Sequence, residues 1–134
     1  MNELKVFTLE EANRLLPTVT ERTQDLHRKR DEITAQEVEV DALELVRSHT
    51  DDDAAGALEK LMARHRELVA EFYEVVDQIH SYGCFLNDAD LGLVDFYGTV
   101  DGHTVYLCWR LGEQQVGFWH EVGQGYANRN PIDR

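Results

Sequence analysis

The stretch LGLVDFYGTVDGHTVYLCWRLGEQQVGFWHE, residues 91–121, decides the fold that we predict for this chain of 134 residues. It contains both tryptophans and one of the two cysteines, and it is rich in β-branched and aromatic residues. The pair Asp101-Gly102 within it is typical of a two-residue β-hairpin turn. We therefore expect residues 91–121 to form a three-stranded antiparallel β-meander.

The Asp101-Gly102 turn also predicts the register of the first two strands. With the turn at that place, Val100 lies opposite His103 and Phe96 lies opposite Leu107. One face of this hairpin is then almost wholly apolar, and we expect it to cover the helices. The other face carries Leu93, Asp95, Tyr97, Thr99, Thr104, Tyr106, Cys108 and Arg110.

The third strand of the expected meander is VGFWHE, residues 116–121. If the loop before it has an even number of residues, Phe118 and His120 lie on the apolar face with His103. Trp119 and Glu121 then lie on the opposite face. Whether this loop has an even or an odd number of residues therefore decides which side chains of the third strand share a face with those of the second.

The sequence pattern before residue 91 predicts mainly helix. Thr8 and Glu11 form a capping-box pattern, and helical periodicity continues to about residue 82. The acidic stretch 48–53 is the clearest linker, while residues 34–46 either continue the first helix or follow a break. The stripe of apolar residues over 54–80, which includes Leu58, Met62, Val69 and Val76, predicts an antiparallel coiled-coil-like hairpin with the first helix, or self-association through the same seam. Gly83 stands where a left-handed C-terminal cap of the second helix belongs.

Composition narrows the class of function. The chain has 13 Lys and Arg against 26 Asp and Glu, which gives a net charge of −13. This acidic balance argues against a nucleic-acid partner and against an anionic membrane surface. Two cysteines and no apolar leader or membrane-length run predict a cytoplasmic protein with reduced thiols.

One predicted interaction surface lies on the polar and aromatic face of the meander. Aromatic residues and arginine are enriched at the energetic centres of protein interfaces. The candidate contact residues are Tyr97, Tyr106, Arg110 and Trp119. The alternative is that the tail, with Tyr126 and Pro131, folds back over this face.

A competing hypothesis is a divalent-metal site of a hydrolase-like enzyme. The even-loop register places His103 near His120 on adjacent strands, and Glu121 supplies a carboxylate. The alternative for His120 is a hydrogen-bonded histidine of the core. Cys108 has no histidine base on its own face in this register, so we interpret it as a structural thiol.

Two segments resemble a known family when they are taken together. They are FTLEEANRLLP near the start, and GLVDFYGTVDGHTVYLCWRLGEQQVGFWHE with the following GYANRNPI. This combination is similar to the bacterial family catalogued as domain of unknown function 2203. The resemblance implies a small cytoplasmic bacterial protein without an assigned activity, so it carries over no catalytic residues.

We therefore predict a single α+β domain over residues 1–134. A long antiparallel helical hairpin, at about 8–82, precedes a three-stranded meander, at about 91–121, and an irregular tail, 122–134. The predicted function is a non-enzymatic, homo-oligomeric interaction or scaffold module that uses the helical seam and the aromatic sheet face. No cofactor is expected under this hypothesis, and the expected partner is a second copy of the chain.

Overall fold

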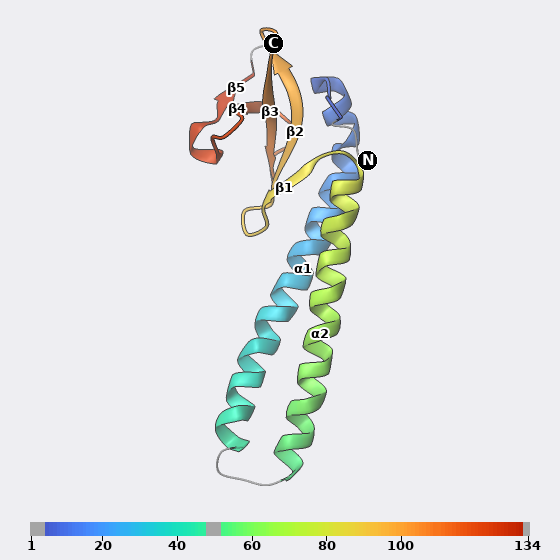
Figure 1. The fold of residues 1–134 in the computed structure, drawn as a ribbon, viewed down its shortest axis with the longest axis vertical. Coiled ribbons are helices and arrows are strands. Elements are labelled where there is room, and N and C mark those ends of the chain that lie inside the picture. Colours follow the sequence, from blue (N-terminus) through green and yellow to red (C-terminus); the bar gives the residue numbers. More distant parts are fainter. Residues whose placement is uncertain (1–4, 48–51, 133–134) are drawn as a thin grey trace.

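The chain folds as a helical hairpin followed by an antiparallel sheet, in a computed structural model that describes residues 5–47 and 52–132. The sheet lies at one end of the hairpin, and the rest of both helices projects away from it (Figure 1). The elements are α1 (Leu9–Arg47), α2 (Asp52–Ser81), β1 (Phe85–Asp88), β2 (Leu93–Val100), β3 (His103–Arg110), β4 (Phe118–Glu121), the 3-10 helix η1 (Tyr126–Asn128) and β5 (Asn130–Pro131). The predicted α+β class is confirmed.

Helix α1 begins at the predicted capping box. The backbone N–H of Thr8 donates to Glu11 Oε1 at 2.9 Å, and the N–H of Glu11 donates to Thr8 Oγ1 at 3.1 Å. These bonds to Thr8 lower the pKa of the Glu11 carboxyl. The helix then runs for 39 residues, so residues 34–46 continue it without a break. At 1.5 Å per residue its length is about 58 Å.

Helix α2 returns along α1, and the two make the predicted hairpin. Its most buried hydrophobic residues are Leu58, Leu68, Val75 and Ile79, while Met62, which was expected on the seam, is 44% exposed. The buried stripe is therefore rotated from the predicted one. The helix ends at Ser81, and Gly83, two residues further on, has the left-handed φ of 95° of a C-terminal cap, with its N–H donating to the His80 carbonyl at 3.0 Å. The predicted linker, 48–53, lies mostly outside the described residues.

The sheet has five antiparallel strands in the order β1-β2-β3-β4-β5, so the prediction of three strands is wrong. The added strands, β1 and β5, are short, and β1 carries a register irregularity between Leu86 and Asp88. The tail predicted to be irregular contains η1 and β5. The register predicted for β2 and β3 is confirmed, with Val100 opposite His103 and Phe96 opposite Leu107.

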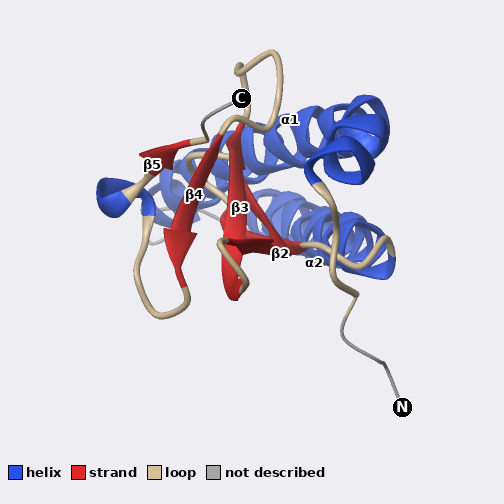
Figure 2. Cartoon of the chain, turned by 90° about the horizontal axis from the view of Figure 1, so that it is seen from above, coloured by secondary structure: helices blue, strands red, loops and turns tan. Residues whose placement is uncertain are grey.

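The apolar face of β2 and β3 packs against the helices, as predicted. Figure 2 shows the sheet beside the helices when the molecule is viewed from above. The core cluster takes Phe96 and Trp109 from the sheet, Val19 from α1 and Ile79 from α2. Phe7 joins it just before α1, where its N–H donates to the Tyr97 carbonyl at 2.7 Å. The opposite face of the sheet therefore points away from the helices.

Candidate functional site

The third predicted strand, β4, presents its faces the other way round. His120 lies opposite Tyr106, and Trp119 lies opposite Leu107. The loop between Arg110 and Phe118 has seven residues, 111–117, and an odd number reverses the inward and outward positions. The prediction for this strand is therefore wrong. His120 belongs to the outer face of the sheet, and Trp119 packs toward the core.

The four residues of the predicted interaction surface are only partly brought together. The Tyr106 hydroxyl donates to the Tyr97 hydroxyl at 3.0 Å, and this bond, with burial, raises the pKa of Tyr106 to about 12. Arg110 lies on the same face, but its guanidinium donates to the Tyr126 hydroxyl at 3.0 Å. Trp119 is on the other face, where its ring lies 6.1 Å from that of His103. The tail thus covers part of the face, as in the alternative from the sequence.

The predicted metal site is not assembled either. His103 Nε2 lies 3.0 Å from Glu121 Oε1, and both side chains are about half exposed. His120 is fully buried on the opposite face of the sheet. The hypothesis of a hydrolase site at His103, His120 and Glu121 therefore fails on the strand register.

The reversed strand instead creates a buried polar cluster, which we call the outer-face cluster: Asp95, Cys108 and His120. Asp95 is 2% exposed, and the other two side chains are fully buried. One possible ligand atom from each of the three lies within 4.8 Å of those of the others. His120 Nε2 is 3.1 Å from Asp95 Oδ1, and Asp95 Oδ2 accepts from the Asn87 amide at 2.7 Å. Three neighbouring strands, β2, β3 and β4, supply the cluster.

The thiol of Cys108 is not a nucleophile in this arrangement. Burial, helped by the nearby negative charge of Asp95, raises the pKa of Cys108 to about 12. The thiol therefore stays protonated at neutral pH, and a thiolate is the reactive form of cysteine. These facts support the interpretation of Cys108 as a structural thiol, although His120 shares its face and was not expected there.

An arginine from the tail closes one side of the outer-face cluster. Arg129 Nη1 lies 4.0 Å from Cys108 Sγ, and the same guanidinium donates twice to the Glu113 carboxylate, at 3.0 and 2.9 Å. It also stacks over the ring of Phe118 at 4.0 Å. Burial raises the pKa of Glu113, but the bonds from Arg129 and from the backbone N–H of Arg110, with the charges of both arginines, together outweigh it and lower that pKa. The pair fixes the tail on the sheet.

The contacts of Asn87, Glu113 and Arg129 were not predicted from the sequence. These residues lie in a four-residue strand, a loop and the tail, which were read as turn or irregular segments. The segment GYANRNPI, which contains Arg129, carries no local pattern that predicts the contacts of this arginine.

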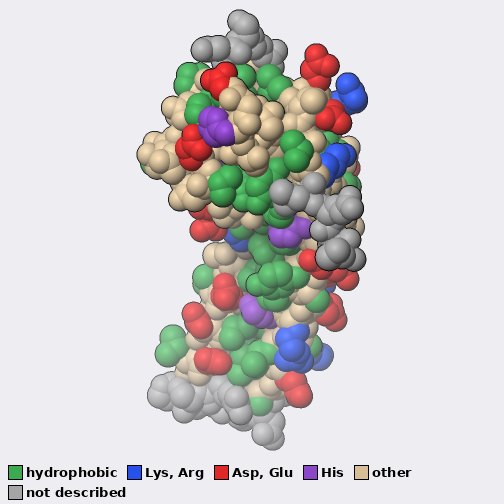
Figure 3. Space-filling model, turned by 45° about the horizontal axis from the view of Figure 1, so that its top comes forward, with side chains coloured by type: hydrophobic (Ala, Val, Ile, Leu, Met, Phe, Trp, Pro, Cys, Tyr) green, Lys and Arg blue, Asp and Glu red, His purple; other side chains and the backbone are tan. Residues whose placement is uncertain are grey.

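The second candidate region is the distal arm, defined here as residues 31–46 of α1 and 55–66 of α2. Figure 3 shows hydrophobic side chains along the projecting helices, between acidic and basic ones. Val38 is 65% exposed and Met62 is 44% exposed. A shallow depression of about 330 Å³ lies beside them, lined by Glu39, Ala42, Leu43, Val46 and Leu61.

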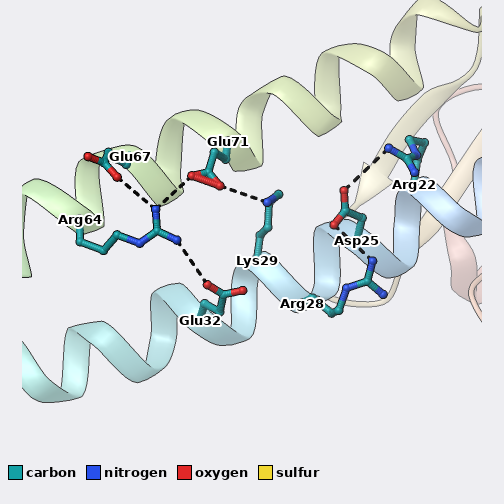
Figure 4. Close-up of polar contacts among 8 residues, drawn as sticks. All are labelled: Arg22, Asp25, Arg28, Lys29, Glu32, Arg64, Glu67 and Glu71. Carbon is teal, nitrogen blue, oxygen red and sulfur yellow. Dashed lines mark hydrogen bonds and ion pairs between the residues drawn. The ribbon is translucent and has the colours of Figure 1, made fainter.

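Ion pairs hold the two helices of the hairpin together where the arm begins (Figure 4). Arg64 lies 3.3 Å from Glu71 on its own helix and 3.9 Å from Glu32 on α1, while Lys29 reaches Glu71 at 3.2 Å. These side chains are largely solvated, so each pair contributes little to the stability of the hairpin. The ion pairs therefore align the two helices with each other but add little to the stability of the hairpin.

A wide groove of about 1130 Å³ runs beside the start of α1. It is lined by Thr8, Leu9, Glu10, Asn13, Arg14, Leu16, Pro17, Thr20, Gln114 and Gln115. Asn13 fixes its edge, since its Oδ1 accepts from the Val116 N–H at 2.7 Å. The lining brings one acidic and one basic side chain to an open surface and contains no histidine or cysteine.

These observations define an α+β protein with a projecting helical hairpin and a sheet whose outer face holds a buried polar cluster. A family model described as "Uncharacterized conserved protein (DUF2203)" matches residues 5–132, and the chain belongs to this family. No curated protein and no solved structure matches it. Within the described residues, neither helix is long and apolar enough to cross a membrane.

Proposed function

We propose that the protein is a non-enzymatic, homodimeric interaction module whose contact surface is the distal arm. The observation that carries the proposal is the burial pattern of α1. No hydrophobic side chain in residues 27–46 of this helix is buried within the chain, although the segment includes Ile33, Val38, Val40 and Leu43. A helix of this composition gains most of its stability by covering an apolar stripe.

The sheet does not supply that cover. The core cluster reaches only to Leu26 on α1 and begins again at Val75 on α2. Beyond it, among the residues that the structure describes, the two helices pack only on each other, and two helices side by side leave part of each apolar stripe in water. A second hairpin packed on the first would complete a four-helix bundle, which is a common solution for such stripes.

Charge favours a second copy of this chain as the occupant of the surface. Residues 31–46 contain six acidic residues and no lysine or arginine, whereas residues 60–66 contain three basic residues and no acidic one. In an antiparallel dimer, the acidic α1 stretch of one copy lies beside the basic α2 stretch of the other. This local complementarity offsets the repulsion of two chains that each carry a charge of −13.

The same substitution at the two ends of the molecule tests the proposal. Val38 on the arm and Val122 beyond β4 are both exposed, at 65% and 52%. Val38→Asp should weaken the dimer at least about tenfold, because a desolvated charge in the interface costs more than about 1.4 kcal/mol. Val122→Asp is the matched control and should leave the dimer unchanged. Equal effects of the two variants in sedimentation equilibrium would reject the arm as the interface.

The proposed location is the cytoplasm. Both cysteines, Cys84 and Cys108, are free and buried, and reduced thiols are usual in that compartment. Fractionation of the native host with antibodies against the protein would test this directly, and recovery in an extracellular or membrane fraction would contradict it.

A further inference from the structure

Both ring nitrogens of His120 face an oxygen atom. Nδ1 of the imidazole lies 3.0 Å from the Glu121 backbone carbonyl oxygen, and Nε2 lies 3.1 Å from Asp95 Oδ1. A neutral imidazole carries one N–H, so it can donate to only one of these two oxygens. When Nδ1–H donates to the Glu121 carbonyl, the lone pair of Nε2 faces Asp95 Oδ1, and a second proton or a metal ion between them would join the two side chains.

The sulfur of Cys108 distinguishes a metal ion from a proton as the group between His120 and Asp95. This sulfur joins the same cluster, and the three side chains can each place a ligand atom within 4.8 Å of the others. A proton shared by His120 and Asp95 needs no sulfur beside it, whereas nitrogen, sulfur and carboxylate oxygen are the ligands of zinc in proteins. We propose that Asp95, Cys108 and His120 bind a divalent transition-metal ion of the Zn²⁺ type.

The distances fit such an ion after a small adjustment. Zinc bonds of about 2.0–2.3 Å in tetrahedral geometry place neighbouring ligand atoms roughly 3.3–3.7 Å apart. Asp95 Oδ1 and His120 Nε2 are already 3.1 Å apart. The widest separation within the cluster is at most 4.8 Å, so side-chain rotations of about 1 Å would close it.

The surrounding groups orient the ligands as metal sites require. A histidine that binds a metal usually donates its other ring N–H to a carboxylate or a backbone carbonyl, which is the role of the Glu121 carbonyl here. Asn87 holds Asp95 through Oδ2 and leaves Oδ1 facing His120. The positive charge of Arg129, near the sulfur, is balanced by its two bonds to Glu113.

The ligand set predicts both the class of ion and its effect. A thiolate favours soft or borderline ions over Mg²⁺ and Ca²⁺. Cys108 would release its proton to solvent on binding, as thiol ligands do. Because the three ligands come from β2, β3 and β4, the ion would join these strands and stabilise the sheet.

Titration with Co²⁺ tests the site, because cobalt enters zinc sites and its thiolate complexes absorb light. The full chain is purified without a metal-affinity column, stripped with a chelator and titrated with Co²⁺ and then with Zn²⁺. We expect one equivalent of Co²⁺ to give a thiolate-to-cobalt band and one equivalent of Zn²⁺ to remove it. Cys108→Ser should abolish the band, whereas Cys84→Ser, at the other buried thiol, should retain it.

A second measurement needs no variant and covers the case in which Cys108→Ser does not fold. Nitrogen NMR of the His120 ring in excess Zn²⁺ should show Nε2 bound to the metal and without a proton, while Nδ1 carries the proton that is donated to the Glu121 carbonyl. The proposal is overturned by a folded wild-type protein that gives no cobalt band, by a band that survives in folded Cys108→Ser, or by a His120 ring whose Nε2 carries a proton in excess Zn²⁺. The last result would identify the cation as a proton.

Discussion

The two ends of the molecule solve the problem of covering apolar surface in different ways. At the sheet end, both helices and one face of β2 and β3 enclose Phe96 and Trp109 completely. At the distal arm, within the described part of the chain, the two helices pack only on one another, and Val38 and Met62 remain exposed. The stability of the single chain therefore resides at the sheet end, while the arm has apolar surface available for association.

Removal of a core ring should give the largest difference between the two ends. Phe96→Ala leaves a cavity in the fully enclosed core and should lower the free energy of unfolding by about 3–5 kcal/mol. Val38→Ala on the arm should change it by about 0.5 kcal/mol or less in the monomer. Urea denaturation at low protein concentration measures both variants, and similar losses would contradict the comparison.

Two histidine–carboxylate pairs, one buried and one exposed, allow the effect of burial to be compared within the sheet itself. Asp95→Asn removes the charge that faces His120 in a buried cluster and should cost about 1–3 kcal/mol in metal-free protein. His103→Gln breaks a solvated pair with Glu121 and should cost about 1 kcal/mol or less. Thermal unfolding followed by circular dichroism compares them. A larger effect at His103 would mean that the outer-face cluster does not contribute to folding.

Acid should loosen the tail before it affects the arm. The pKa of Glu113 is lowered in the folded protein, chiefly by Arg129 acting against burial. A lowered pKa gives stability that is full above the pKa of the unfolded chain and is lost as pH falls through the folded value. Tail docking should therefore weaken below the ordinary range of a glutamate carboxyl, by about 1 kcal/mol.

Limited proteolysis with an acid-active protease would detect this loosening. Cleavage near residues 122–132 should increase as pH falls, and Glu113→Gln should be cleaved at neutral pH as readily as the wild type is at low pH. A tail equally protected in both proteins at every pH would show that the Arg129 pair does not hold it.

Much of the fold follows from local signals in the sequence. The capping box at Thr8, the left-handed cap at Gly83 and the hairpin turn at Asp101-Gly102 are all found as predicted. Each depends on a few neighbouring residues whose backbone preferences are strong. The hairpin register, with Phe96 opposite Leu107, follows from that turn alone.

The candidate site could not be predicted because it depends on one loop of ambiguous length. A change of one residue in the loop before Phe118 exchanges the faces of β4. That exchange brings His120 to Asp95 and Cys108, and it separates His120 from His103. Arg129 reaches the cluster only through the folded tail, and nothing in its local sequence encodes that distant contact.

The central claim is that the arm joins two copies of the chain, and sedimentation equilibrium of the wild-type protein tests it most directly. At micromolar concentration and moderate salt, we expect a mass of twice the 15.4 kDa of one chain. We also expect the dimer to dissociate in Val38→Asp and to persist in Val122→Asp. A wild-type protein that remains a monomer throughout the micromolar range would contradict the claim.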